Sequence, residues 1–197
     1  MKRVRIIVLL ISLIVSSLSV SAMGYGRGGM GIEGFRFGVK AGLNLATIKS
    51  RTEFNYKSGF YVGIVEEFKI TENFSFQPEF IYSQQGALDK DNNDIKYKYD
   101  YFLLPIMTVI HASDMFNIQF GPQFGYNLSA QKEGADGVTT PIKNDVNKFD
   151  FGFNMRVGVE VSNNFAINLG YHWGITEIKN KQDNRNMVFN VGLVAKL

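Results

Sequence analysis

Most of the chain alternates between apolar and polar residues with a period of two, the pattern of a β-strand whose two faces meet different environments. In the first run, apolar Phe35, Phe37, Val39, Ala41, Leu43 and Leu45 oppose Arg36, Gly38, Lys40, Gly42 and Asn44. Similar runs cover residues 116–128, 149–161, 165–175 and 187–197, and less regular ones cover 59–70, 74–84 and 97–110. The pattern therefore predicts eight strands.

The polar face of these strands is unusual for a soluble protein. Between residues 116 and 128, every position opposite the apolar face is Gly, Asn or Gln. A soluble barrel or sandwich would turn its apolar face inward and expose a charged face to water. Small and amide side chains instead suit a narrow interior, where they relieve crowding and hydrogen-bond to one another. We therefore expect the apolar face to point outward, toward lipid.

The connections between the predicted strands alternate between long and short. Residues 46–58, 85–96, 129–148 and 176–186 form long polar connections, whereas 71–73, 111–115 and 162–164 are short. Outer-membrane barrels have tight periplasmic turns and extended extracellular loops. The sequence predicts an all-β fold, an eight-stranded antiparallel up-and-down transmembrane β-barrel. Both barrel termini are expected on the periplasmic side, and any protein partner is expected at the four long loops.

Aromatic residues gather near the predicted strand ends. Five phenylalanines are predicted at periplasmic ends, where they would form one interfacial girdle: Phe35, Phe74, Phe116, Phe149 and Phe165. A second set lies nearer the long loops, and some of its members are expected to form the other girdle: Tyr61, Tyr82, Tyr97, Tyr99, Tyr101, Tyr126, Tyr171 and Trp173.

Four residues disturb the strand pattern. Glu66 interrupts the apolar face of the second run, and Pro78, Pro105 and Pro122 lie inside strands. Proline has no N–H group to donate to a neighbouring strand. We expect local bulges, or a register displaced by one or two residues, at the three prolines.

The N-terminus has the organisation of a secretory signal peptide. Lys2, Arg3 and Arg5 precede an apolar run over residues 6–15, which is too short for a comfortable transmembrane helix. The Val20-Ser21-Ala22 pattern predicts cleavage after Ala22, although a retained anchor is the alternative. Residues 23–34 are glycine-rich and are predicted to form a flexible leader, and residues 35–197 the barrel.

Removing the signal peptide changes the charge of the chain. The chain has 21 Lys and Arg and 18 Asp and Glu, and loss of three basic residues leaves 18 of each sign. A formally neutral protein gives no reason to expect nucleic acid as a partner. The outward apolar face makes outer-membrane lipids the expected surroundings. The chain has no cysteine, which excludes disulfides, cysteine nucleophiles and thiolate metal sites.

Several segments resemble a known family. They are the runs at residues 37–45, 67–70, 74–79 and 190–196, which are similar to PorT-like outer-membrane β-barrel domains. The resemblance extends from Phe35 to Leu197 and implies an eight-stranded OmpA/OmpX-like barrel in a Gram-negative outer membrane. The chain departs from the family pattern at residues 101–105 and at its final Leu197. PorT itself is associated with protein secretion, a role that barrel motifs alone do not specify.

Charged residues at interior positions are predicted to form a polar network with nearly balanced charge. The candidates are Arg36, Lys40, Glu67, Glu79, Asp150, Arg156, Glu160, His172 and Lys196. Eight strands leave room only for side chains, so a diffusion pore is not expected. His172 is interpreted as a hydrogen-bonded lumen residue, with a lumenal general base as the alternative. His111 is expected to be solvated at a periplasmic turn.

Three functions fit these observations. The first is a non-enzymatic barrel that supports the envelope or presents its loops to a partner. The second is a lipid A-modifying enzyme, which would need a catalytic triad near the lipid face, and the third is a small transport barrel. Acidic residues in the 129–148 loop are too sparse for a calcium site. We predict no cofactor and no catalytic or metal-binding residues.

Overall fold

The protein is described by a computed structural model over residues 34–50, 54–179 and 183–197. These residues belong to one compact unit, Ile32–Leu197. The predicted signal peptide, its cleavage site and all but the last residue of the glycine-rich leader lie outside the described residues.

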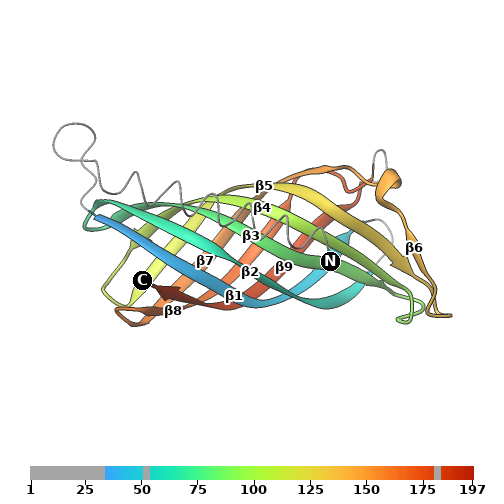
Figure 1. The fold of residues 1–197 in the computed structure, drawn as a ribbon, viewed down its shortest axis with the longest axis horizontal. Coiled ribbons are helices and arrows are strands. Elements are labelled where there is room, and N and C mark those ends of the chain that lie inside the picture. The colour runs from blue at the N-terminus through green and yellow to red at the C-terminus, as the bar shows by residue number, and fades with distance from the viewer. Residues whose placement is uncertain (1–33, 51–53, 180–182) are drawn as a thin grey trace. The chain divides into compact units, whose positions relative to one another are not determined.

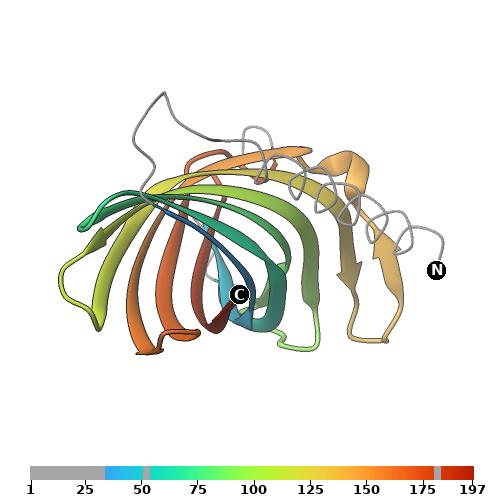
Figure 2. The ribbon, with the colours of Figure 1, turned by 60° about the vertical axis from the view of Figure 1, so that its left-hand side comes forward.

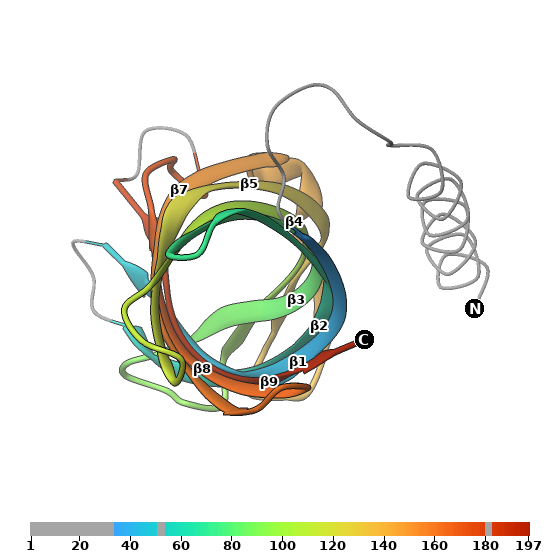
Figure 3. The same ribbon diagram turned by 90° about the vertical axis from the view of Figure 1, so that its left-hand side faces the viewer.

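Eight long antiparallel strands close into a barrel, which confirms the predicted fold class (Figures 1 and 3). They are β1 (Gly34–Lys49), β2 (Phe54–Thr71), β3 (Phe74–Asp89), β4 (Lys96–His111), β5 (Phe116–Glu133), β7 (Phe149–Ser162), β8 (Phe165–Gly174) and β9 (Arg185–Lys196). Each strand pairs with its sequence neighbours, and β1 pairs with β9 to complete the ring. A short strand, β6 (Thr139–Pro141), adds to β5 outside the ring.

The three predicted short turns connect strands at one end of the barrel. Serine side chains stabilise two of them: Ser113 Oγ accepts from the backbone N–H of Phe116 at 3.1 Å, and Ser162 Oγ accepts from that of Phe165 at 3.2 Å. Such side-chain contacts replace backbone bonds that a tight turn cannot make. In outer-membrane barrels the tight turns lie on the periplasmic side, so this end is called the periplasmic end below.

At the opposite end, much of the sequence predicted as loop is strand. β1 continues to Lys49, β3 to Asp89 and β5 to Glu133, while β2 begins at Phe54. The 129–148 segment also contains β6 and a 3-10 helix, η1 (Lys143–Asp145). Figure 2 shows β5 and β6 side by side beyond the body of the barrel. Beyond the membrane the outward positions need not be apolar, while inward Ala87, Tyr99 and Ala130 are buried, so the alternation that predicts the strands inside the membrane does not continue there.

The faces of the barrel are reversed relative to a soluble protein. Outward residues such as Leu43 (64% exposed) and Leu193 (59%) are apolar, whereas the inward Lys40 is 1% exposed. A continuous apolar exterior of this kind is stable against lipid hydrocarbon rather than water. Among the described residues, no helix is long and apolar enough to cross a membrane.

One aromatic prediction is wrong. Phe149 begins β7 and pairs with Tyr126, so it lies at the outer end of the barrel. β7 follows a long outer connection and runs from the outer end toward the periplasmic end, so its first residue lies at the outer end. Phe149 contacts Tyr126, with 5.4 Å between ring centroids. Tyr61, Tyr99 and Tyr101 of the predicted outer set are buried inside the barrel instead.

The predicted bulges at the prolines are also absent. Pro78 pairs with Ile106, Pro105 with Gln123 and Pro122 with Phe153, and the register is the same on both sides of each proline. The ladder tolerates a missing N–H where its neighbours hold the strand in place. Glu66 lies opposite Phe37 in the register, and only 4% of it is exposed.

Candidate functional site

Polar side chains fill the interior of the barrel in three clusters along its length. The central cluster consists of Lys40, Glu79 and Arg156, which β1, β3 and β7 place across the lumen from one another. Lys40 Nζ lies 3.2 Å from Glu79 Oε1, and Arg156 Nη1 donates to the same oxygen at 2.5 Å. Gln77 Nε2 also donates to Glu79, at 2.7 Å. Several charged donors on one carboxylate offset the cost of burying it.

The periplasmic cluster joins β2, β7 and β9. Lys196 Nζ lies 2.7 Å from Glu160 Oε1 and 3.5 Å from Glu67 Oε2. Asn117 Nδ2 donates to Glu160 at 3.1 Å. Because these partners come from strands on different sides of the ring, their bonds connect the barrel walls.

His111 belongs to this periplasmic cluster, so the expectation of a solvated turn residue is wrong. It ends β4 on the inward-facing side, with Nε2 3.1 Å from Glu67 Oε1 and 2.9 Å from Ser75 Oγ. The grouping of Ser75, His111 and Glu67 differs from a hydrolase triad. In a triad the serine and the acid bind opposite ring nitrogens, whereas here both lie at Nε2.

The outer cluster is centred on Asp150 of β7. Thr176 Oγ1 donates to Asp150 Oδ1 at 2.6 Å, and Asn186 Nδ2 lies 3.4 Å from Asp150 Oδ2. Asn186 also donates to the Tyr101 hydroxyl at 3.1 Å. His172 is buried nearby, but its Nε2 lies 3.9 Å from Asp150, beyond hydrogen-bond distance. Neither ring nitrogen of His172 has a hydrogen-bond partner among the described residues.

An apolar plug extends through the barrel from the central cavity to the outer end. It consists of Ile48, Tyr61, Ile81, Ala87, Tyr99, Tyr101, Leu103, Ala130, Val146 and Ile178. Val146 and Ile178 come from the two outer connections before β7 and β9. The backbone N–H of Asn147 donates to the carbonyl of Ile178 at 2.7 Å, which ties these connections together.

Little open space remains in the lumen. The central cavity measures about 30 Å³, and a second near the periplasmic cluster measures about 10 Å³. Glycines make room for the aromatic side chains beside them: a Cβ added to Gly42 would lie 2.7 Å from the Tyr61 ring. The central cavity has room for about two water molecules and the smaller one for about one, so neither cavity forms an open channel.

The structure distributes the predicted network residues unevenly. Lys40, Glu79 and Arg156 meet in the central cluster, Glu67, Glu160 and Lys196 in the periplasmic one, and Asp150 and His172 near the outer one. Arg36 is exposed and makes no ion pair with any described residue. The sequence does contain a signal for His111, because the alternation of β4 continued by one residue places it inward. The prediction ends this strand at residue 110 and therefore misses it. Among the described residues, no group of three or more His, Asp or Glu side chains is placed to hold a metal.

At the outer end, β3, β4, β5 and β6 form an outer sheet, defined by Gln85–Asp89, Lys96–Asp100, Ser129–Glu133 and Thr139–Pro141. Its inward residues Ala87, Tyr99 and Ala130 belong to the plug. Lys96 and Lys98 of β4 both donate hydrogen bonds to Glu133 of β5. The two bonds to lysine hold the pKa of the Glu133 carboxyl below its ordinary value. These ion pairs join adjacent strands outside the apolar band.

Comparisons with known proteins agree with this architecture. A family model described as an outer membrane protein beta-barrel domain matches residues 22–180. Neisserial surface protein A shares 15% identity, with a TM-score of 0.56 over 83% of this chain and 99% of that protein. The attachment invasion locus protein Ail of Yersinia pestis shares 12% identity, with a TM-score of 0.54 over 82% of this chain and 98% of Ail. At these identities the likeness shows the fold alone. A search of curated proteins finds no match.

Proposed function

Because the chain belongs to the outer membrane protein beta-barrel domain family, we propose that it is a non-enzymatic outer-membrane barrel that presents its outer sheet to a protein partner. In this proposal the signal peptide directs export and is cleaved after Ala22. The filled lumen anchors and stiffens the barrel, and recognition takes place on the elements that reach water beyond the outer leaflet.

The observation that carries this proposal is the outer sheet itself. The sheet continues the barrel strands outward, so its geometry is fixed by the barrel rather than by a flexible loop. Among the described residues, its last strand, β6, pairs only with β5, so its other edge is open. An ordered surface with an open strand edge binds a partner at a lower entropic cost than a loop that must first become ordered.

The lumen contributes stability rather than passage in this proposal. Charged partners from different strands bind across the interior, and the apolar plug extends from the central cavity toward the outer mouth. A conducting barrel would need a continuous water-filled route, and a lipid-modifying one would need its catalytic groups near the lipid face. The polar clusters described above face the lumen. A role in protein secretion, as the PorT resemblance suggests, is compatible with a partner at the outer sheet.

The proposal is tested by crosslinking in intact cells with a reagent that does not cross the outer membrane. The test variant replaces residues 132–140 with Asn-Gly, a two-residue turn that joins Gln131 to Pro141, which are already paired. We expect the wild-type protein to be crosslinked to a specific partner and the shortened variant to lose it. A closed barrel resists unfolding in detergent and therefore migrates differently on a gel before and after boiling. Both proteins must show this difference, so that loss of folding is not mistaken for loss of binding.

Two outcomes would contradict the proposal. In the first, no partner is recovered from cells that carry a folded, surface-exposed barrel. In the second, the shortened variant is crosslinked to the same partner as efficiently as the wild type, which would place recognition elsewhere on the barrel.

A further inference from the structure

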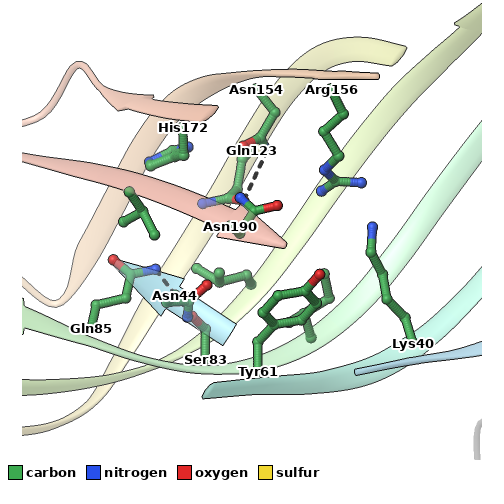
Figure 4. A pocket seen from close by; sticks show the side chains of 13 residues that line it. Lys40, Asn44, Tyr61, Ser83, Gln85, Gln123, Asn154, Arg156, His172 and Asn190 are labelled. Atoms are coloured by element: carbon green, nitrogen blue, oxygen red, sulfur yellow. Dashed lines mark hydrogen bonds between the residues drawn. The ribbon is translucent and has the colours of Figure 1, made fainter. Parts of the chain in front are cut away.

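The central cavity is lined by polar side chains whose hydrogen-bonding groups are not all used. Figure 4 shows Lys40, Tyr61 and Arg156 turned toward one another, with Gln123 and His172 on the adjoining wall. These five side chains come from β1, β2, β7, β5 and β8, and each is at least nine-tenths buried. The cavity of about 30 Å³ has room for about two water molecules or for one small ion.

Donors outnumber acceptors among the unused groups. Arg156 Nε and Gln123 Nε2 are buried donors without a partner, and the Tyr61 hydroxyl also lacks one. A neutral His172 ring adds one further N–H donor and one acceptor nitrogen. The other unpartnered acceptor lining the cavity is Gln85 Oε1. Buried donors without partners are costly, so this small excess favours an occupant that accepts hydrogen bonds.

The formal charge beside the cavity is positive, which favours an anionic occupant as the excess of donors does. Lys40 and Arg156 are two cations that bind one carboxylate, Glu79, and together the three carry a single positive charge. Glu79 is not among the residues that line the cavity, whereas Lys40 and Arg156 are. The next carboxylate, Asp150, is held by the neutral side chains of Thr176 and Asn186 and, like Glu79, does not line the cavity. A buried positive charge is stabilised when an anion lies close to it in a poorly polarisable interior.

We propose that the central cavity binds a single chloride-sized inorganic anion. Water donates two hydrogen bonds for every two it accepts, so filling this space with water would add donors where donors are already in excess. A halide accepts from several N–H and O–H groups at once and neutralises the Lys40, Glu79 and Arg156 charge. The anion would stabilise the folded barrel, because the unfolded chain has no such site.

The first experiment measures folding stability in halide and non-halide salts. The midpoint of the heat-dependent gel shift is compared in sodium bromide and in sodium gluconate at equal ionic strength, since gluconate is too large for the cavity. We expect bromide to raise the wild-type midpoint by about 3 °C relative to gluconate. Gln123→Glu, which replaces a donor with a carboxylate, should lose this difference. Asn168→Leu, a buried substitution at the smaller cavity, should retain it.

A second experiment does not depend on the stability of a variant. Crystals of the wild-type barrel soaked in bromide are expected to show an anomalous scattering peak in the cavity, within contact distance of Arg156 Nε. Ordered water without anomalous signal at that position would overturn the proposal. A bromide effect on the midpoint that is equal in the wild type and in Gln123→Glu would also overturn it, because the effect would then come from salt in general.

Discussion

At the scale of single residues, the stability of this barrel depends on polar groups that have no access to water. Glu79 accepts from Lys40, Arg156 and Gln77, and it is completely buried. A buried charge of this kind is stable only while its partners are present. Removing the carboxylate leaves two cations facing each other, whereas removing all three charges leaves none unpaired.

Glu79→Gln is therefore expected to destabilise the barrel by about 3–5 kcal/mol. The combined variant Lys40→Met, Glu79→Leu and Arg156→Met should recover most of that loss, because no charge remains without a partner. Urea unfolding of the refolded proteins in detergent measures both. A Glu79→Gln barrel with the wild-type unfolding midpoint would show that the cluster contributes little to stability.

The lumenal glycines make a second residue-scale prediction. A Cβ on Gly192 would overlap the Tyr61 hydroxyl and lie 2.6 Å from the backbone oxygen of Ala41. Overpacking at such a site costs about 1–3 kcal/mol, so Gly192→Ala should lower the urea midpoint. Gly34→Ala is the matched control, because no atom lies within 4 Å of its added Cβ. Equal midpoints for the two variants would contradict the role assigned to Gly192.

The same residues show what the sequence could predict. Alternation correctly places Lys40, Glu79 and Arg156 inward, because parity along a strand determines the face of every residue. Parity does not say which inward side chains meet, since that depends on the tilt and stagger of the strands. Arg36 shares the inward parity but lies at the end of β1, where water reaches it. His111 was missed because parity was not extended into the predicted turn.

At the scale of elements, the outer sheet is the part of the fold that the sequence describes least well. Residues 85–89 and 129–133 were predicted as loop, yet they continue β3 and β5. Inside the membrane, each strand must be apolar on one face, and this requirement produces the alternation that the sequence shows. Beyond the membrane the outward face need not be apolar, and backbone pairing, buried inward residues such as Ala87 and the Glu133 ion pairs maintain the strands. The position of Phe149 could be predicted from the sequence. Successive strands of the ring alternate in direction, so the sixth, β7, starts at the outer end and Phe149 lies there.

The ion pairs of the outer sheet predict a pH dependence. Bonds from Lys98 and Lys96 lower the pKa of Glu133 in the folded protein, so the folded state favours the ionised carboxyl. The resulting stabilisation is present above the carboxyl's ordinary pKa of 4.5 and is lost as the pH falls through the lowered value. Because Glu133 is only partly buried, at the water-exposed end of the barrel, the effect should be small and local.

Hydrogen exchange, corrected for the intrinsic pH dependence of amide exchange, measures this effect. Protection of the amides in residues 129–133 should decrease at acidic pH relative to amides in the membrane-spanning part of β5. Glu133→Gln should remove the pH dependence while leaving the β5 and β7 register intact. A pH response that persists in Glu133→Gln would assign it to another group.

At the scale of the whole molecule, the barrel is stable because its first and last strands pair. β1 and β9 are hydrogen-bonded from Gly38 to Lys49, so the ring has no open edge within the apolar band. An open edge there would leave backbone groups without partners in lipid, at a cost of several kcal/mol for each group. Removal of β9 should therefore affect the whole barrel, whereas removal of β6, which lies outside the ring, should not.

A truncation after Asn184 tests this consequence of closure. We expect the full-length barrel to resist alkaline carbonate extraction and to migrate differently before and after boiling, since a closed barrel resists unfolding in detergent. The truncated chain should lose both properties, because β1 and β8 would each expose an edge. The variant with residues 132–140 replaced by Asn-Gly should keep both, since it shortens only the outer hairpin. Retention of the boiling-dependent migration by the truncated chain would contradict the prediction, because the remaining strands would then close into a barrel without the pairing of β1 with β9.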